Sequence, residues 1–205
     1  MNNEGDVLRK FALLVGVSVV ALLSSFAHAQ QFDLAVGAGE LFSTRNRSAS
    51  EAYLPPSEKG GIYPSVTIDR IFSNKFGYSA EISTLYKERL YNGFQEYRPF
   101  FYDLNAVYAP HVAKKTTALF GAGAGGTTVL FYNSYAGCGY PGGCVTKFNS
   151  NHFLLHLSAG VSYNVWRKFF VRPEANFYRV VNNNEFHSGN VLRLGASVGY
   201  TFHRD

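Results

Sequence analysis

The sequence predicts an all-β fold, an up-and-down barrel of eight antiparallel strands. Eight segments alternate apolar and polar residues with the period of two that is typical of strands. The composition agrees, because the chain holds 20 Gly, 18 Phe and 14 Tyr among 205 residues. Charged residues make up 16% of the chain, against roughly 25% in an average soluble domain. A disordered chain would be rich in charge and poor in aromatic residues, so the composition excludes one.

Residues 1–29 predict a signal peptide, and residues 30–205 the barrel domain. Arg9 and Lys10 precede a continuous apolar run over 11–23, and residues 27–29 form an A-x-A cleavage site. Thirteen apolar residues fall short of the ~20 that a membrane-spanning helix needs. Export follows from this prediction, and it places the barrel outside the cytoplasm.

The eight alternating segments are each roughly a dozen residues long, which is enough to cross a bilayer at a tilt, because ~9–11 residues suffice. In the last segment, for example, Leu192 and Leu194 alternate with Arg193 and Gly195. The predicted strands are 31–42, 61–72, 76–87, 97–109, 116–132, 151–166, 169–180 and 190–202.

Long and short connections alternate along the chain. The long ones are 43–60, 88–96, 133–150 and 181–189, and the short ones are 73–75, 110–115 and 167–168. In an up-and-down barrel this order places every long loop on one rim and both termini on the other.

Alternation alone leaves open which face meets solvent. A soluble barrel of the lipocalin kind buries its apolar face, whereas a membrane barrel turns that face to lipid. Three observations favour the membrane barrel. The polar faces carry Gly, Ser, Thr and Asn in place of Lys and Glu, the short connections carry basic residues, and aromatic residues gather at the strand ends as an interfacial girdle. These aromatic residues are Phe32, Phe42, Phe72, Phe76, Tyr86, Phe100, Tyr108, Phe153, Tyr163, Phe169, Phe177, Tyr200 and Phe202.

The last strand carries a resemblance to a known family. Residues 194–202 alternate apolar residues and end on Tyr200 and Phe202, which resembles the C-terminal assembly signal of small eight-stranded outer-membrane barrels of the OmpA/OmpX type. That family usually ends at the final Phe, whereas three residues follow it here. The resemblance implies a monomer in the outer membrane of a Gram-negative bacterium. It also implies contact with outer-membrane lipid, with lipopolysaccharide and with the barrel assembly machinery.

Neither a nucleic acid nor a cofactor is expected. The net charge of +5 is spread over scattered bases, and export makes nucleic acid an improbable partner. Residues 121–126 match G-x-G-x-x-G, but the strand pattern continues through them, and a dinucleotide site needs a helix there. His152 and His156 would lie about 13 Å apart on a strand, so we expect polar lumen or rim residues and no shared metal.

Cys138 and Cys144 are the two cysteines of the chain, and both lie in the third long connection. Five residues separate them, three of which are Gly and one Pro, so the chain can bring the two sulfur atoms together. An exported protein is exposed to an oxidising compartment. We therefore predict a disulfide that shapes the tip of this loop.

Eight charged residues occupy positions on the polar faces of the predicted strands. A charge inside a narrow barrel must be paired or hydrated, and we predict a network of ion pairs that fills the lumen. The residues are Asp33, Asp69, Glu81, Lys87, Asp103, Arg172, Glu174 and Arg193.

These observations predict a protein without a catalytic centre that supports the envelope and recognises an unknown surface ligand through its four long loops. Two alternatives stay open. The charges of the lumen could line a narrow channel for small solutes or ions. Glu185, His187 and Ser188 lie together on the last long loop, as in outer-membrane lipid A deacylases, although the H-x-S-N motif of those enzymes is not reproduced.

Overall fold

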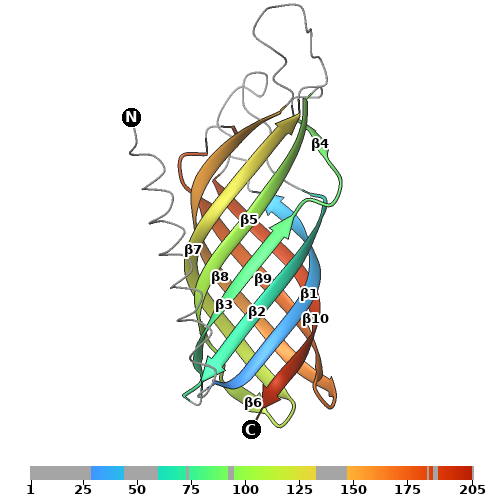
Figure 1. The fold of residues 1–205 in the computed structure, drawn as a ribbon, viewed down its shortest axis with the longest axis vertical. Coiled ribbons are helices and arrows are strands. Elements are labelled where there is room, and N and C mark those ends of the chain that lie inside the picture. The colour runs from blue at the N-terminus through green and yellow to red at the C-terminus, as the bar shows by residue number, and fades with distance from the viewer. Residues whose placement is uncertain are drawn as a thin grey trace, which may run out of the picture.

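The computed structural model describes residues 29–43, 60–72, 74–91, 95–132, 147–183, 185–186 and 189–204, which form a closed barrel (Figure 1). Its wall consists of eight long strands: β1 (Ala29–Ser43), β2 (Ile62–Phe72), β3 (Phe76–Thr84), β5 (Gln95–Tyr108), β7 (Thr116–Tyr132), β8 (Lys147–Trp166), β9 (Phe169–Val180) and β10 (Asn190–Arg204). Two short strands, β4 (Arg89–Tyr91) and β6 (His111–Ala113), extend the sheet next to β5 and β7. The predicted fold class is confirmed. Among the described residues there is no helix long and apolar enough to span a membrane.

All pairings are antiparallel, and the β1–β10 pair closes the ring. One row of partners on the inner face runs through Asp33, Asp69, Ser79, Asn105, Gly123, His156, Tyr178, Val191 and Ser43. This row returns to β1 ten residues beyond its start (43 − 33 = 10). Such a stagger requires strands that are strongly tilted to the barrel axis, as Figure 1 shows.

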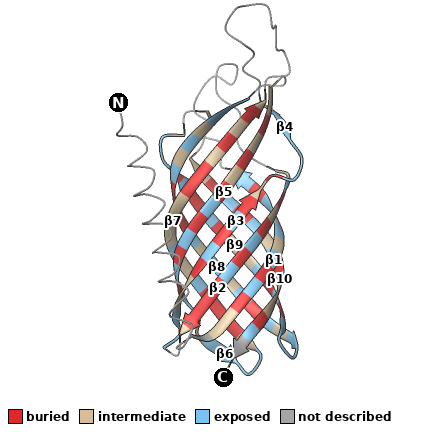
Figure 2. Cartoon of the chain, in the orientation of Figure 1, coloured by how far each residue is buried: buried red, intermediate tan, exposed pale blue. Residues whose placement is uncertain are grey.

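The burial of the strands is the reverse of that in a soluble protein. Buried residues alternate with exposed or intermediate ones along most of β3 and β5 (Figure 2). The exposed positions are the large apolar ones, such as Val36, which is 53% exposed, and Leu157, which is 56% exposed. The polar residues Asp33, Asp103 and Asn176 are buried in the interior. An apolar surface of this extent needs an apolar surrounding.

Aromatic residues line the outer surface at the end of the barrel that holds the short turns, here called the turn end. Phe32 of β1 contacts Phe202 of β10 at a ring distance of 5.6 Å. The row continues from Phe202 to Tyr200 at 5.0 Å and from Tyr200 to Phe169 of β9 at 5.1 Å, and it ends with Phe169 and Trp166 at 6.1 Å. Four neighbouring strands thus share a continuous girdle.

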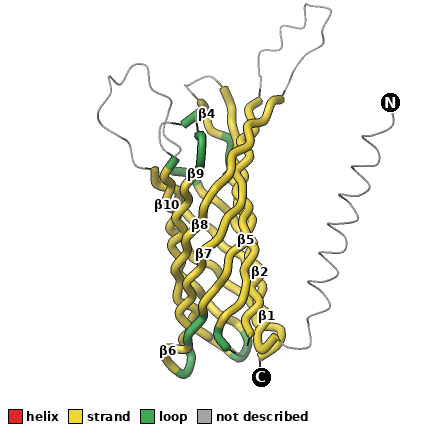
Figure 3. Tube along the Cα trace, turned by 90° about the vertical axis from the view of Figure 1, so that its left-hand side faces the viewer, coloured by secondary structure: helices red, strands yellow, loops and turns green. Residues whose placement is uncertain are grey.

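At the opposite end, the loop end, β5, β7 and β8 rise above the other strands (Figures 1 and 3). We call residues 95–98, 128–132 and 147–151 the extended sheet. Its outer face is mostly polar. Asn149 and Asn151 precede Phe153 on β8, and Arg98 precedes Phe100 on β5, whereas Leu130 and Tyr132 of β7 share this face. The apolar belt of the barrel therefore ends below the extended sheet.

Six of the eight predicted strands have different ends, and in two of them an end differs by more than two residues. The predicted strand 76–87 stops at Thr84, because residues 85–88 form a bend between β3 and β4. Lys87 lies in this bend and is exposed, so its assignment to the lumen is wrong. β8 begins at Lys147, four residues before the predicted start at 151. The predicted signal peptide lies outside the described residues, apart from Ala29 at the start of β1.

Candidate functional site

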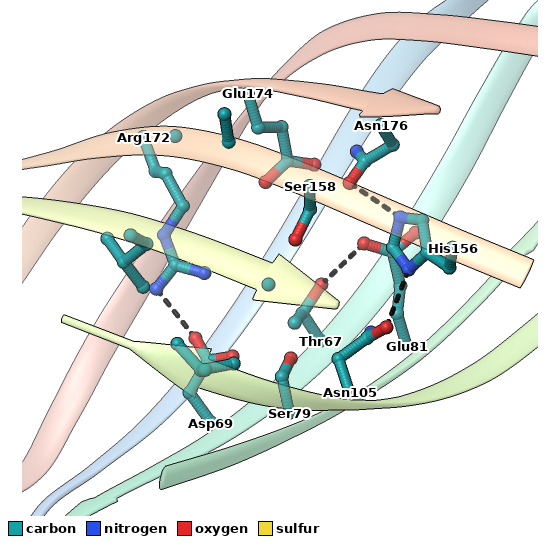
Figure 4. Close-up of a pocket in the computed structure, with 15 residues that line it drawn as sticks. Thr67, Asp69, Ser79, Glu81, Asn105, His156, Ser158, Arg172, Glu174 and Asn176 are labelled. Carbon is teal, nitrogen blue, oxygen red and sulfur yellow. Dashed lines mark hydrogen bonds and ion pairs between the residues drawn. The ribbon is translucent and has the colours of Figure 1, made fainter. Parts of the chain in front are cut away.

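The inner wall carries a layer of charged side chains across the middle of the barrel, which we call the polar layer. Asp33 of β1 lies directly opposite Asp69 of β2 in the sheet, and like charges in that position repel. Arg172 of β9 relieves this repulsion. Its Nη2 atom lies 2.7 Å from Oδ2 of Asp69 (Figure 4) and 3.9 Å from Oδ2 of Asp33.

A second guanidinium group forms ion pairs with two further acids of the polar layer. Arg193 of β10 forms an ion pair with Glu81 of β3 and lies 3.5 Å from Oε1 of Glu174 on β9. Glu81 also accepts hydrogen bonds from the hydroxyl groups of Tyr178 and Thr67, each at 3.3 Å. Arg193 is 1% exposed, so its charge is neutralised by these partners and not by solvent.

His156 of β8 completes the polar layer. Its Nδ1 atom lies 3.0 Å from Oδ1 of Asp103 on β5, and its Nε2 atom lies 3.1 Å from Oδ1 of Asn176 on β9. The imidazole ring stacks on Tyr178 at 4.6 Å. The sequence placed His156 among polar lumen or rim residues, but it did not link the ring to Asp103, which lies 53 positions away.

Seven of the eight predicted lumen charges therefore lie on the inner wall, and Lys87 does not. Two groups that sequence reasoning missed are Tyr178 and Asn176, which bridge the charged residues. Both share the inward parity of Arg172 and Glu174 on β9, and that parity was the available signal.

Buried apolar clusters lie on both sides of the polar layer. The cluster towards the loop end consists of Leu41, Tyr63, Leu85, Phe101, Leu154, Tyr178, Val180 and Val191. The cluster towards the turn end consists of Ile71, Val107, Ala109 and Leu119. The cavity between them has a volume of about 30 Å³ and is lined by residues such as Glu81, Asn105 and Ser158 (Figure 4). That volume holds a single water molecule.

The G-x-G-x-x-G segment lies inside β7, and no helix follows it. Its glycines allow the neighbouring strands to approach closely. A Cβ atom on Gly123 would lie 2.1 Å from the backbone oxygen of Leu104, and one on Gly121 would meet Ser158. The segment is therefore a packing feature of the wall next to the polar layer.

A second polar group lies at the loop end, and we call it the mouth cluster: Tyr91, Tyr97, Phe131, Ser150, His152, Glu185 and Phe186. Nε2 of His152 on β8 lies 2.8 Å from Oε2 of Glu185 on the last connection. Ser150 donates a hydrogen bond to Oε1 of Glu185 and lies 3.0 Å from Nε2 of His152. The hydroxyl of Tyr91 donates to the backbone oxygen of Glu185 at 2.6 Å.

Ser150, His152 and Glu185 have the residue types of a hydrolytic triad but not its geometry. In a triad the serine and the acid contact opposite nitrogens of the imidazole. Here both contact Nε2, so the nitrogen that donates to Glu185 has no lone pair for the serine proton. The hydroxyl of Ser150 also donates to the carboxylate. This arrangement holds a loop in place and does not activate a nucleophile.

The aromatic part of the mouth cluster surrounds Phe186, which is 2% exposed. Its ring lies 5.7 Å from the ring of Tyr91 and 5.3 Å from that of Tyr97. Phe131 lies 5.2 Å from Tyr91, at an interplanar angle of 82°, and edge-to-face pairs of this kind are favourable. Phe186 thus anchors the last connection inside the mouth of the barrel.

The mouth cluster shifts the pKa of two of its members. Partial burial raises the pKa of Glu185, but the hydrogen bonds from Ser150 and from its own backbone amide, together with the charge and hydrogen bond of His152, outweigh burial and lower the pKa overall. Burial, and secondly the charge of Glu185, raise the pKa of Tyr91. Glu185 is therefore held as a carboxylate and Tyr91 as a phenol that can donate.

Several predicted residues are not brought into either group. Cys138, Cys144, His187 and Ser188 lie outside the described residues, so the disulfide stays a prediction. Phe202 belongs to the girdle of the turn end, where it contacts Tyr200. The role of Tyr200 and Phe202 as an assembly signal also stays a prediction.

Solved structures of outer-membrane proteins resemble this barrel. Neisserial surface protein A matches with a TM-score of 0.61 and 12% identity over 86% of this chain and 99% of that chain. OprG from Pseudomonas aeruginosa matches with a TM-score of 0.57 and 13% identity over 86% and 97%. The attachment invasion locus protein Ail of Yersinia pestis, solved with the heparin analogue sucrose octasulfate, matches with a TM-score of 0.54 and 12% identity over 84% and 97%.

No protein-family model matches the sequence, and no curated protein sequence matches it either. At these identities the structural similarities show the fold. The chain has the fold of the small eight-stranded outer-membrane β-barrels.

Proposed function

We propose that the protein is an integral outer-membrane protein that supports the envelope and recognises a surface ligand through its loop end. The observation that carries this proposal is the inverted burial of the wall. Large apolar side chains such as Leu104 and Ile82 are more than half exposed, whereas the charged side chains are enclosed. A lipid bilayer satisfies the apolar belt, and the girdle at the turn end matches an interface between lipid and water.

The extended sheet supports the recognition role. Its outer face is mostly polar, its strands continue beyond the other strands of the wall, and it carries the two ends of connection 133–146. In this proposal the turn end faces the periplasm, and the long connections face the exterior. Phe148 lies at the tip of the sheet, is 44% exposed and stacks on Phe131 at 4.9 Å. Exposed aromatic rings on polar loops suit adaptable contacts with a partner.

The closed interior argues against the channel alternative. Apolar clusters lie on both sides of the polar layer, and the cavity within that layer has a volume of only about 30 Å³. A conducting lumen would require a continuous hydrated path. In planar bilayers we expect no conductance above background, and a reproducible channel signal would reject this part of the proposal.

Fractionation of cells that express the full chain tests the location. We expect the protein in the outer-membrane fraction, and we expect it to migrate differently on SDS gels before and after boiling, because a folded barrel binds less detergent than an unfolded chain. Recovery as a soluble protein would overturn the proposal.

Display on cells tests recognition. Cells that display the full chain are compared with cells that display a chain whose connections 43–60 and 133–146 are replaced by short Gly/Ser linkers. The probes are surfaces coated with heparin or with purified lipopolysaccharide. The proposal expects binding that is lost with the shortened connections, at equal amounts of folded barrel. Equal binding of the two cell types, or binding by neither, contradicts recognition of these probes through the loops.

A further inference from the structure

We propose that the pair His152–Glu185 is a proton-operated latch that keeps Phe186 inserted in the mouth of the barrel, and that protonation of Glu185 releases this plug. The proposal concerns how the mouth is held closed. It does not depend on the surface-recognition role, because the latch is formed entirely by residues within this chain.

Glu185 is tethered to two separate elements of the wall. Its carboxylate contacts Ser150 and His152 on β8, the latter at 2.8 Å. Its backbone oxygen accepts a hydrogen bond from Tyr91 of β4 at 2.6 Å. The charge of the carboxylate strengthens the contacts with β8, whereas the contact with β4 does not depend on that charge. Loss of the charge therefore weakens two of the three tethers and leaves the third unchanged.

The plug is the next residue along the chain. Phe186 lies among Tyr91, Tyr97 and Phe131, with the apolar Val129 beside them. Because one peptide unit separates the latch from the plug, release of residue 185 frees the backbone that holds the ring in this site. The last connection leaves β9 through Asn182, which has a positive φ of 56°. That left-handed conformation is sparsely populated for residues other than glycine, and it marks a tight reversal about which the connection can pivot.

The groups that face Glu185 are few. Among the described residues, the titratable ones are His152 of β8 and Tyr91 of β4, with Ser150 as a further polar partner. β5 contributes Tyr97 to the mouth, and β7 contributes the apolar residues Val129 and Phe131. None of these is a second carboxylate or a guanidinium that could replace Glu185 in the pair.

The direction of the pH dependence follows from the closed state. The contacts with Ser150 and His152 lower the pKa of Glu185 below its usual range. The latch therefore contributes stability above the ordinary pKa of a glutamate, and this contribution is lost as the pH falls through the lowered value. The imidazole adds an ion pair wherever it is protonated, and neutral imidazole can still donate from Nε2. Closure thus extends from neutral to mildly acidic solution, and release occurs in stronger acid.

A single-tryptophan reporter tests the latch. Trp166 is the only tryptophan of the chain, so a Trp166→Phe, Phe186→Trp variant carries one indole at the plug. Quenching by acrylamide is measured in detergent micelles from neutral pH downwards. We expect weak quenching at neutral pH and a severalfold increase once the pH passes below the usual range of glutamate. Unchanged quenching over this range would overturn the proposal.

Matched substitutions separate the latch from a general effect of acid. Glu88 forms an ion pair with Arg98 at 3.1 Å at the same end of the barrel, but it holds no plug. In the reporter background, Glu185→Gln should give strong quenching at neutral pH with no further response to acid. Glu88→Gln should retain the acid response. An acid response that survives in Glu185→Gln rejects the latch.

Amide exchange checks the result without a reporter. The backbone N–H of Val181 donates to the backbone oxygen of Phe153 at 2.9 Å, four residues before the latch. At one neutral pH, this amide should exchange severalfold faster in Glu185→Gln than in the wild type or in Glu88→Gln. Equal exchange in all three proteins would contradict the proposal. The gel shift on boiling verifies that each variant is a folded barrel.

Discussion

Two histidines of β8 meet a carboxylate in two different surroundings. His156 contacts Asp103 at 3.0 Å, with both side chains at most 2% exposed. His152 contacts Glu185 at 2.8 Å, and the side chain of Glu185 is 26% exposed. The chemistry of the two pairs is the same and their distances are similar. They differ in burial and in what carries the acid.

The element that carries the acid decides what each pair can do. Asp103 lies on β5, whose backbone is held on both sides by the sheet. Glu185 lies on the connection between β9 and β10, so it can move without breaking the wall. A buried pair is costly to break from one side, whereas a pair at the rim contributes little to global stability. The inner pair is therefore part of the structure, and the outer pair can act as a switch.

The largest effect is expected where the polar layer loses a cation. Arg193→Met removes the guanidinium that serves both Glu81 and Glu174. Since this leaves buried carboxylates without compensation, the free energy of unfolding should fall by about 3–5 kcal/mol. Urea unfolding of the protein in phospholipid vesicles measures the change. The double variant with Glu81→Gln should recover part of the loss. A loss no greater than that of a rim substitution would remove the distinction between the two regions.

The apolar layer between the two histidines should give the next largest effect. Leu154 lies on the inner face of β8 between His152 and His156 and is fully buried. Leu154→Ala should lower the free energy of unfolding by about 3 kcal/mol, because it removes packing and leaves a cavity. Leu157→Ala is the matched control on the outward face of the same strand and should cost less. Equal costs would mean that the interior is no better packed than the surface that meets lipid.

The sequence predicted the wall well because residues on one face of a strand recur at every second position. All eight long strands were found, and β7 and β9 have the predicted ends. The alternation also identified the inward charges, such as Asp33 and Arg172, before their partners were known. It failed at Lys87, because the bend at residues 85–88 breaks the period, and no residue in the bend is a Gly or a Pro.

The pairing of side chains across the barrel was beyond reach of the sequence. Register decides which inward residues meet, and register depends on how eight strands close into a ring. Tyr178 illustrates this, because its hydroxyl reaches Glu81 across 97 positions of the chain. The mouth cluster was missed for a similar reason. Glu185 was grouped with His187 and Ser188 by proximity in sequence, whereas the structure joins it to β8 and β4.

Substitution of each histidine compares the two pairs directly. His156→Gln should lower the free energy of unfolding by about 2 kcal/mol, because Asp103 loses a hydrogen bond in a buried site. His152→Gln should cost less than about 1 kcal/mol, because its acid remains partly hydrated. Both are measured by urea unfolding in the same vesicles. If the order of the two losses is reversed, the rim pair is the structural one, and the comparison fails.

The smallest effect is expected at the tether that carries no charge. Tyr91→Phe removes the hydroxyl that donates to the backbone oxygen of Glu185 but keeps the ring next to Phe186. The pKa of Tyr91 is raised by burial and secondly by the charge of Glu185, so the hydroxyl stays protonated at neutral pH, and this tether does not respond to acid. Loss of one such hydrogen bond costs about 0.5 kcal/mol, or roughly a twofold faster exchange of the Val181 amide. This increase should appear in the wild-type background and again in Glu185→Gln, since the hydroxyl contacts the backbone and not the carboxylate. An effect that vanishes in Glu185→Gln would mean that the carboxylate alone positions the loop, and that Tyr91 adds no tether of its own.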